Sequence, residues 1–221
     1  MAGEPKGTAQ IYDATSDEYG SVSDRWSMTK GLPGEVIYQV TAEDFHVTAS
    51  GGGAITQAQW FGFYEEQGGD CTSGYTDSFT VTYYDSVLHP ATGTRVPGGV
   101  MATFTAQPMR TLMPQGEWLG NGLPLYVYTL SHSAVTVAGG GCHFIEVRNN
   151  GGEASAGGCH WHWAWAADVA SPPDWNYSAF WLGPDGTSYE DMGDVFPEKN
   201  LAFSLNIQFD RVDPAALCAS E

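Results

Sequence analysis

Apolar and polar residues alternate along much of the chain, as they do in β-strands that bury one face. The clearest case is Leu201–Phe209, in which every second residue is apolar from the first to the last. Phe79–Asp85 alternates in the same way and places Phe79, Val81 and Tyr83 on one side. Both segments therefore predict strands with one buried side.

Other runs rich in β-branched and aromatic residues are separated by glycine and proline turns, which predicts many short strands. They are Val36–Val47, Ile55–Glu65, Val100–Thr105, Leu125–Leu130, Ala134–Ala138 and Cys142–Arg148. Gly62 lies inside one such run, where glycine marks a bulge or a close backbone approach. Two segments break the rhythm: 1–35 is expected to be irregular, and 167–200 is expected to form a long loop.

The segment Cys159–Trp165 separates two kinds of side chain, because successive residues of a strand point to opposite faces. One face carries the indoles of Trp161, Trp163 and Trp165, and the other carries the imidazoles of His160 and His162. Three indoles exposed together, as a platform for sugars, would form a large apolar patch. We therefore expect the indoles to face the core and the imidazoles to face outward.

These patterns predict an all-β fold, an antiparallel β-sandwich of the jelly-roll kind, formed by a single domain spanning 1–221. The chain has 28 glycines and 12 prolines, and only 15% of its residues are charged, which fits short strands and tight turns better than helices. A length of 221 residues is sufficient for one sandwich around one core.

The charge balance restricts the partners. With 8 Lys and Arg against 26 Asp and Glu, the formal net charge of −18 repels phosphate backbones and anionic membrane surfaces. No apolar run approaches the ~20 residues that a membrane helix needs. We therefore expect neither nucleic acid binding nor membrane insertion.

Cys71, Cys142, Cys159 and Cys218 are an even number of cysteines, which predicts disulfides and a secreted, extracellular protein. Three pairings are possible, and the sequence does not choose among them. Joining Cys142 to Cys159 closes the shortest loop. However, if both flank one hairpin, alternation points the first outward and the second inward, so a bulge would be needed.

A His-x-His pair on a strand can offer two nitrogens to one metal ion, and His160 and His162 have that spacing. A third ligand could be His143, Glu146 or a carboxylate from 167–200. The alternative is that both histidines simply meet solvent. No cofactor is assigned; a transition metal at this pair and calcium at a carboxylate-rich loop are the two candidates.

The segment 167–200 is the candidate binding region, because it places aromatic rings beside short polar side chains. The ligand-binding candidates are Asp174, Trp175, Asn176, Tyr177, Trp181 and Tyr189. Rings can stack on sugar faces, while carboxylates and amides bond to hydroxyls. The structural alternative is that these rings cap one end of the sandwich. No motif selects catalytic residues.

Five segments give the chain a family resemblance. They are Ala42–Phe45, Trp60–Tyr64, Phe79–Asp85, Trp161–Trp165 and Leu201–Leu205. Over residues 11–209 the chain resembles secreted bacterial β-sandwich domains found in extracellular proteins with C-terminal sorting tails or dockerins. The resemblance implies a fold like jelly-roll and carbohydrate-binding modules, with no catalytic residues. The chain departs from the group by having Glu43 where Asp is common, by its four cysteines and by a short acidic end at 218–221.

We therefore expect a secreted, non-catalytic domain that binds polysaccharide or cell-surface glycan, or that forms part of an extracellular surface assembly. Two alternatives stay open. One is a metal-binding protein or metal-dependent oxidative enzyme that uses His160 and His162. The other is a self-associating structural subunit.

Overall fold

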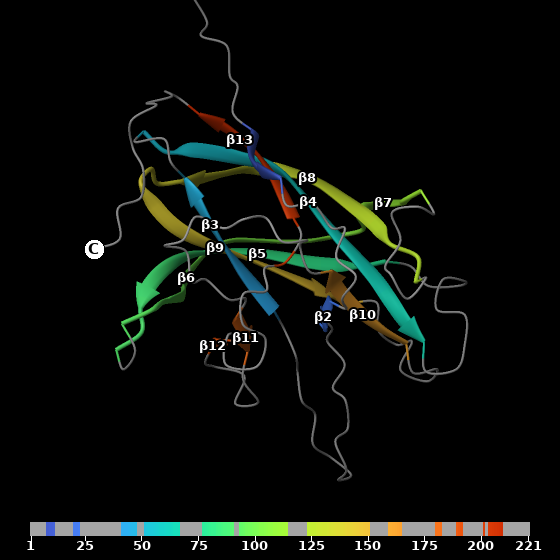
Figure 1. Cartoon of the computed structure of the whole chain (residues 1–221). Helices are drawn as coiled ribbons and strands as arrows, with labels where there is room; N and C mark the ends of the chain where they lie inside the picture. Colours follow the sequence, from blue (N-terminus) through green and yellow to red (C-terminus); the bar gives the residue numbers. More distant parts are fainter. Residues whose placement is uncertain are drawn as a thin grey trace, which may run out of the picture.

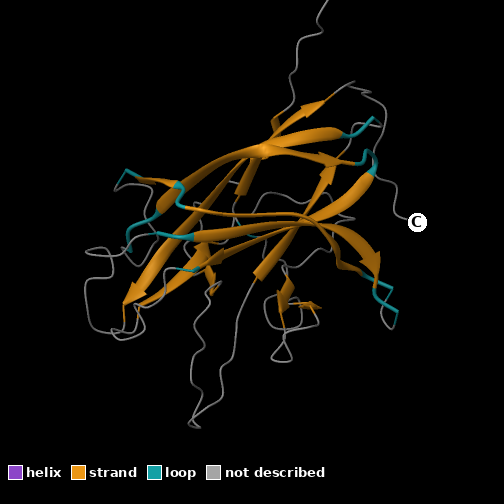
Figure 2. Cartoon of the chain, turned by 180° about the vertical axis from the view of Figure 1, so that it is seen from behind, coloured by secondary structure: helices purple, strands orange, loops and turns teal. Residues whose placement is uncertain are grey.

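The computed structural model describes residues 8–11, 20–22, 41–47, 51–66, 77–90, 93–114, 123–150, 159–164, 180–182, 189–191, 201 and 203–209. These residues form strands β1–β13 and no helix. The strands lie in two antiparallel sheets (Figures 1 and 2). The prediction of an all-β antiparallel sandwich is confirmed. Within the described ranges there is also no helix long and apolar enough to cross a bilayer.

The first sheet is organised around β4, a strand of 14 residues (Gly53–Glu66). One edge of β4 pairs with β8, which pairs in turn with β7; the other edge pairs with β13 and then, toward its C-terminal end, with β10. Two short strands complete the sheet, β1 beside β13 and β2 beside β10. The bounds are β1 Thr8–Ile11, β2 Gly20–Val22, β7 Met109–Leu112, β8 Tyr126–Val137, β10 Cys159–Ala164 and β13 Phe203–Phe209.

The second sheet has the strand order β12-β11-β3-β9-β5-β6. The bounds are β3 Thr41–Val47, β5 Phe79–Leu88, β6 Arg95–Ala106, β9 Gly141–Asn149, β11 Phe180–Leu182 and β12 Tyr189–Asp191. Four strands of only three or four residues, β1, β2, β11 and β12, fall inside the two segments 1–35 and 167–200. Strands this short carry too few residues for a periodic pattern. β1, β2 and β11 each add to a longer strand, and β12 adds to β11.

The core between the sheets is dominated by aromatic side chains. Trp161 and Trp163 are fully buried there, which confirms the inward orientation expected of these two indoles; Trp165 lies outside the described residues. Trp60 stacks on Tyr128 at a centroid distance of 5.8 Å, and Phe79 meets Trp161 edge-on at 4.9 Å. Aromatic pairs in such geometries stabilise a core beyond the area they bury.

Gly62 explains how Trp161 fits against β4. A Cβ built on Gly62 would lie 2.5 Å from Cζ2 of Trp161, so the indole lies directly against the glycine backbone. No larger residue leaves room for the ring in this position. The close approach expected from a glycine inside this strand is confirmed.

Strand β13 shows the expected alternation. Phe203, Leu205 and Ile207 are buried, whereas Asn206 and Gln208 between and beside them are exposed. The ladder with β4 shifts by one residue between Asn206 and Ile207. The strand therefore contributes one apolar face to the core and one polar face to the surface.

Candidate functional site

Strands β11 and β12 form a hairpin that extends the second sheet beyond β3. Trp181 pairs with Thr41 of β3 on one side and with Glu190 of β12 on the other, and Leu182 pairs with Tyr189. Trp181 and Tyr189 therefore lie on adjacent strands, one position apart in register. Four other candidate binding residues, Asp174, Trp175, Asn176 and Tyr177, lie outside the described residues. Because directly paired residues share a face and successive residues alternate, this register assigns Trp181 and Tyr189 to opposite faces of the hairpin.

The predicted metal ligands fall on different sheets. His160 and His162 lie on β10 of the first sheet, whereas His143 and Glu146 lie on β9 of the second. A spacing of three residues also puts His143 and Glu146 on opposite faces of β9. Nε2 of His143 lies 3.1 Å from the carbonyl oxygen of Ala138, and Glu146 accepts a hydrogen bond of 2.6 Å from the hydroxyl of Tyr84.

Within the described ranges, no three His, Cys, Asp or Glu side chains lie close enough together to hold a metal ion. The side chain of His160 is outside those ranges, so the His-x-His pair itself stays a prediction. A joint set with His143 or Glu146 would have to join two sheets, since β9 and β10 do not pair, and it stays a prediction as well.

His162 corrects the expectation that the outer face of β10 meets solvent. The residue is buried, and its ring stacks on Phe63 of the paired strand β4 at a centroid distance of 5.0 Å. Phe63 forms a second, smaller apolar cluster with Leu125, against which Phe61, Leu123 and Met113 pack. The first sheet is therefore apolar on both faces near this end, and His162 belongs to that outer cluster.

The arrangement of β9 and β10 also bears on the cysteines. Cys142 lies on β9 and Cys159 on β10, and these strands do not pair with each other. The hairpin on which the parity argument relied is therefore wrong. Cys71 and Cys218 lie outside the described residues, so the predicted disulfides stay untested.

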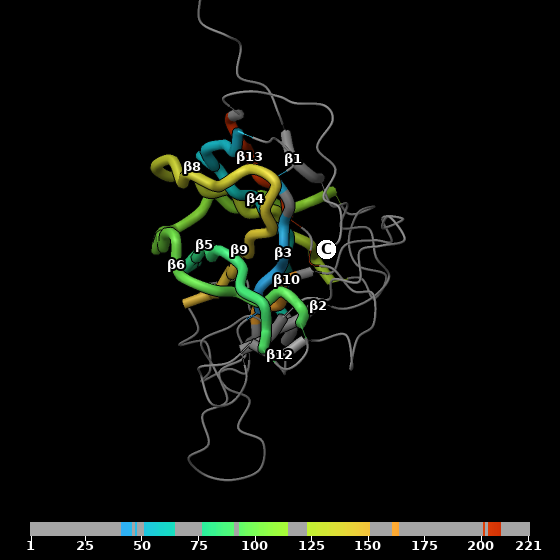
Figure 3. The backbone as a smooth tube through the Cα atoms, turned by 90° about the vertical axis from the view of Figure 1, so that its left-hand side faces the viewer, coloured from blue at the N-terminus to red at the C-terminus, as the bar shows by residue number. Residues whose placement is uncertain are grey.

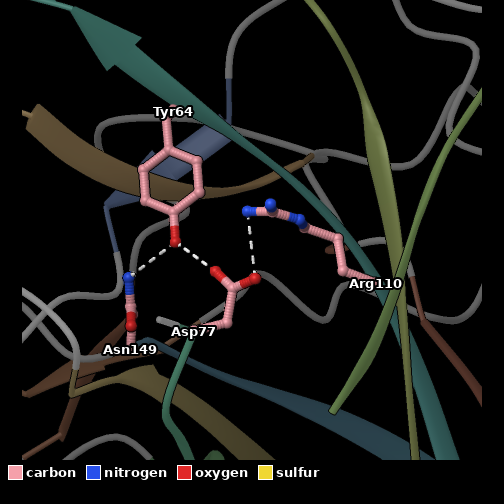
Figure 4. A network of polar contacts seen from close by, with 4 residues as sticks. All are labelled: Tyr64, Asp77, Arg110 and Asn149. Carbon is pink, nitrogen blue, oxygen red and sulfur yellow. Dashed lines mark hydrogen bonds and ion pairs between the residues drawn. The ribbon is translucent and has the colours of Figure 1, made fainter. Parts of the chain in front are cut away.

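A buried polar network joins the two sheets at the end of the sandwich where β4, β5, β7 and β9 meet (Figure 4). The hydroxyl of Tyr64 donates to Oδ1 of Asp77 at 2.6 Å, and Nδ2 of Asn149 donates to the Tyr64 oxygen at 3.3 Å. Nη1 of Arg110 lies 3.0 Å from Oδ2 of Asp77, and its guanidinium lies 5.1 Å from the centroid of the Tyr126 ring. Every member thus contacts a partner from another strand.

The electrostatics of this network favour a structural role. Burial, followed by the influence of Tyr128 and Asp77, raises the pKa of Tyr64 above its ordinary value, so the phenol remains protonated and can donate. The Asp77 carboxylate is matched by one cation and one hydroxyl. Sequence analysis did not identify these residues, because they come from four separate strands or strand ends and no spacing links them.

A second buried carboxyl, Glu43, faces the interior from β3. Its exposed fraction is 1%, and Oε2 accepts a hydrogen bond of 2.7 Å from the backbone N–H of Leu201. Burial and, next, the neighbouring carboxyl of Asp44 raise the pKa of Glu43 well above its ordinary value. Glu43 therefore connects β3 of one sheet to the chain just before β13 of the other. Burial favours the neutral acid, whereas the hydrogen bond from Leu201 by itself favours the carboxylate.

We expect Glu43→Gln to change how stability depends on pH. The pKa of Glu43 is raised in the folded state, so its stabilising contribution is complete below the ordinary carboxyl pKa and is lost as pH rises through the folded-state value. Glutamine keeps an acceptor for Leu201 but cannot ionise. In urea titrations, the free energy of unfolding of the variant, relative to the wild type, should therefore rise as pH increases above the ordinary carboxyl pKa. Asp85→Asn, at an exposed carboxyl, is the control; parallel curves for Glu43→Gln and the wild type would contradict the assignment.

Comparison with protein family models finds no match, and comparison with curated proteins finds none either. Among solved structures, a similar chain is that of the cysteine protease and lectin-like domains of a surface layer associated protein of Clostridium difficile. The two share 10% sequence identity with a TM-score of 0.46 over 78% of this chain. The present chain spans about a third, 32%, of that solved chain. At this level the likeness assigns no function.

Proposed function

We propose that this chain is an extracellular, non-catalytic β-sandwich domain that binds glycan through the β11–β12 hairpin and the surrounding segment 167–200. The observation that supports the proposal most is the register of the hairpin, in which Trp181 is paired with Glu190 on a strand that β3 anchors. Directly paired residues share a face of a sheet, so an aromatic residue and a carboxylate are assigned to the same face of the hairpin. A sheet-anchored arrangement is better preorganised for a ligand than the same residues on a free loop.

The chemistry of the hairpin suits a sugar. Indole and phenol rings offer flat apolar faces to the C–H faces of a pyranose, and both carry a polar group for a hydroxyl. Glu190 pairs with Trp181 in register and Asp191 pairs with Phe180, so carboxylate acceptors for sugar hydroxyls come from the same strands. The other well-placed indoles, Trp60, Trp161 and Trp163, are fully buried in the core and are not available for stacking.

The charge of the chain narrows the class of glycan. A net charge of −18 repels sulfated or uronic acid-rich polysaccharides at ordinary ionic strength. Neutral glycans, or glycans with free amino groups, are therefore the favoured ligands. The extracellular location rests on the even number of cysteines and on the resemblance to secreted domains.

The proposal is tested on a glycan array that includes neutral, amino and sulfated sugars. We expect retention of a neutral or amino glycan, and a loss of at least about tenfold in affinity for Trp181→Ala. Tyr189→Ala, on the opposite face of the hairpin, should have the smaller effect. Leu112→Ala, at an exposed apolar residue of β7, serves as the control and should bind as the wild type does. Retention of no glycan, or equal binding by wild type and both hairpin variants, would refute the function.

A further inference from the structure

Strand β6 forms one end of the second sheet. It pairs with β5 along its length, and within the described residues no strand pairs with its other edge. Figure 3 shows β6 in green at the margin of the molecule, beside β5. None of its twelve residues is buried, in contrast to the neighbouring strand β5, whose first five residues all are. One row of backbone hydrogen-bonding groups of β6 therefore faces outward.

The end of β6 from Ala102 to Ala106 lacks the features that protect most edge strands. Such edges are usually blocked by charged side chains, prolines, bulges or covering elements. Pro97 and one register shift lie in the N-terminal half of the strand, and the other shift leaves Met101 as an extra residue between Val100 and Ala102. The stretch Val100–Ala106 has no charge, no proline and no glycine. Short segments of this composition pair readily with a further strand.

The exposed apolar side chains lie near the same edge. Among the described residues, all large apolar side chains that are exposed belong to β5, β6 or β7; they are Val87, Leu88, Val100, Met109 and Leu112. Val100, in β6 itself, is 63% exposed. The two sheets also meet here, because the ring of His132 on β8 stacks on Phe104 of β6 at 4.3 Å. The free edge and the apolar residues thus form one side of the sandwich, called here the β6 side.

The distribution of charge indicates what can approach the β6 side. Residues 86–145, which include β6, β7 and β8, contain two arginines and a single acidic residue, Glu117. The other 25 of the 26 acidic residues lie elsewhere in the chain. Two copies of a chain with a net charge of −18 repel each other over most of their surface. Asp85 of β5 lies against Gly98 and Gly99 in the N-terminal half of β6, so the uncharged stretch Val100–Ala106 is the part of the β6 side where repulsion is weakest.

We propose that two copies of this chain associate through β6, strand against strand and antiparallel, so that the second sheets of both become one continuous sheet. Antiparallel pairing of a strand with itself is the isologous contact that a twofold axis produces, and twofold dimers are the commonest oligomers. Centred on Thr103, such a pairing places the uncharged stretch Val100–Ala106 opposite itself. Val100 would then pack on the partner copy instead of meeting water.

The experiment measures mass by sedimentation equilibrium over a wide range of concentration. We expect the weight-average mass of the wild type to rise from that of one 23.7 kDa chain toward twice that value. In hydrogen exchange, the amides of Val100–Ala106 should become better protected as concentration rises. In the double variant Val100→Lys/Thr103→Lys, the change at Thr103 places like charges opposite each other across the axis, and the change at Val100 replaces an apolar contact with a charge. The variant should weaken association at least about tenfold.

A matched variant separates this contact from a general effect of charge. Asn206→Lys/Gln208→Lys makes the same change of net charge at exposed positions of β13, in the other sheet, and should associate as the wild type does. A wild type that stays monomeric throughout would overturn the proposal. So would equal association by the β6 variant and the wild type, or equal weakening in both double variants.

Discussion

Replacing Trp161 by alanine is expected to lower the free energy of unfolding by about 3–5 kcal/mol. The indole is fully buried and is enclosed by Phe79, by Tyr128 at a centroid distance of 6.0 Å and by the backbone of Gly62. Its removal leaves a cavity that the rigid ladder of β4 and β10 cannot close. Urea unfolding followed by far-ultraviolet circular dichroism measures the loss.

The control is Leu112→Ala, because Leu112 is 50% exposed and its truncation should change stability by no more than about 0.5 kcal/mol. The same pair of variants distinguishes a core residue from a sugar-stacking platform. If Trp161→Ala proved as harmless to stability as Leu112→Ala and abolished glycan binding instead, the assignment of this indole to the core would be wrong.

The second large effect is expected at Asp77. Asp77→Ala should destabilise the fold by about 3–5 kcal/mol, because it leaves the Arg110 guanidinium and the Tyr64 hydroxyl without their acceptor. The loss of stability is large because the network joins both sheets. Asp77 precedes β5 of the second sheet, whereas Tyr64 and Arg110 belong to the first. Denaturant unfolding again gives the free energy.

A double-mutant cycle with Arg110→Ala tests whether the two side chains act together. Removing both should cost less than the sum of the single losses, with a coupling of about 0.5–3 kcal/mol. Strict additivity would show that the pair makes no joint contribution. Tyr64→Phe, which removes only the hydroxyl and keeps the ring, should lose about 1–3 kcal/mol.

Much of the fold could be predicted from the sequence, because a strand with one buried face shows alternating apolar and polar residues. Alternation correctly placed the strands at Phe79 and Phe203 and the inward indoles of Trp161 and Trp163. Gly62 was also informative, since a glycine inside an aromatic strand has a steric reason to be there.

What the sequence could not provide was the choice of partner strands. β9 and β10 follow each other in the chain and look like a hairpin, yet they lie in different sheets, because alternation reports which face is buried and not which neighbour is paired. For the same reason the Asp77 network could not be predicted, because its members come into contact only when the two sheets pack together. The outer cluster around His162 and Phe63 could not be predicted either.

Two consequences for function follow from the placement of aromatic residues. The indoles of Trp60, Trp161 and Trp163 are buried in the core of the sandwich, and we propose that ligand recognition belongs to the segment that contains Trp181 and Tyr189. In the strand order of the second sheet, β6 stands at one end and the β11–β12 hairpin stands at the other. Glycan binding and self-association could therefore take place on the same molecule without competing for one edge.

Hydroxyl-radical footprinting, with and without the glycan selected on the array, tests this division most directly because it examines all tryptophans in one sample. We expect Trp60, Trp161 and Trp163 to stay unlabelled in both states, and labelling of Trp181 to fall when the glycan is added. Strong labelling of Trp161 and Trp163 that the glycan suppresses, with Trp181 unaffected, would contradict the account.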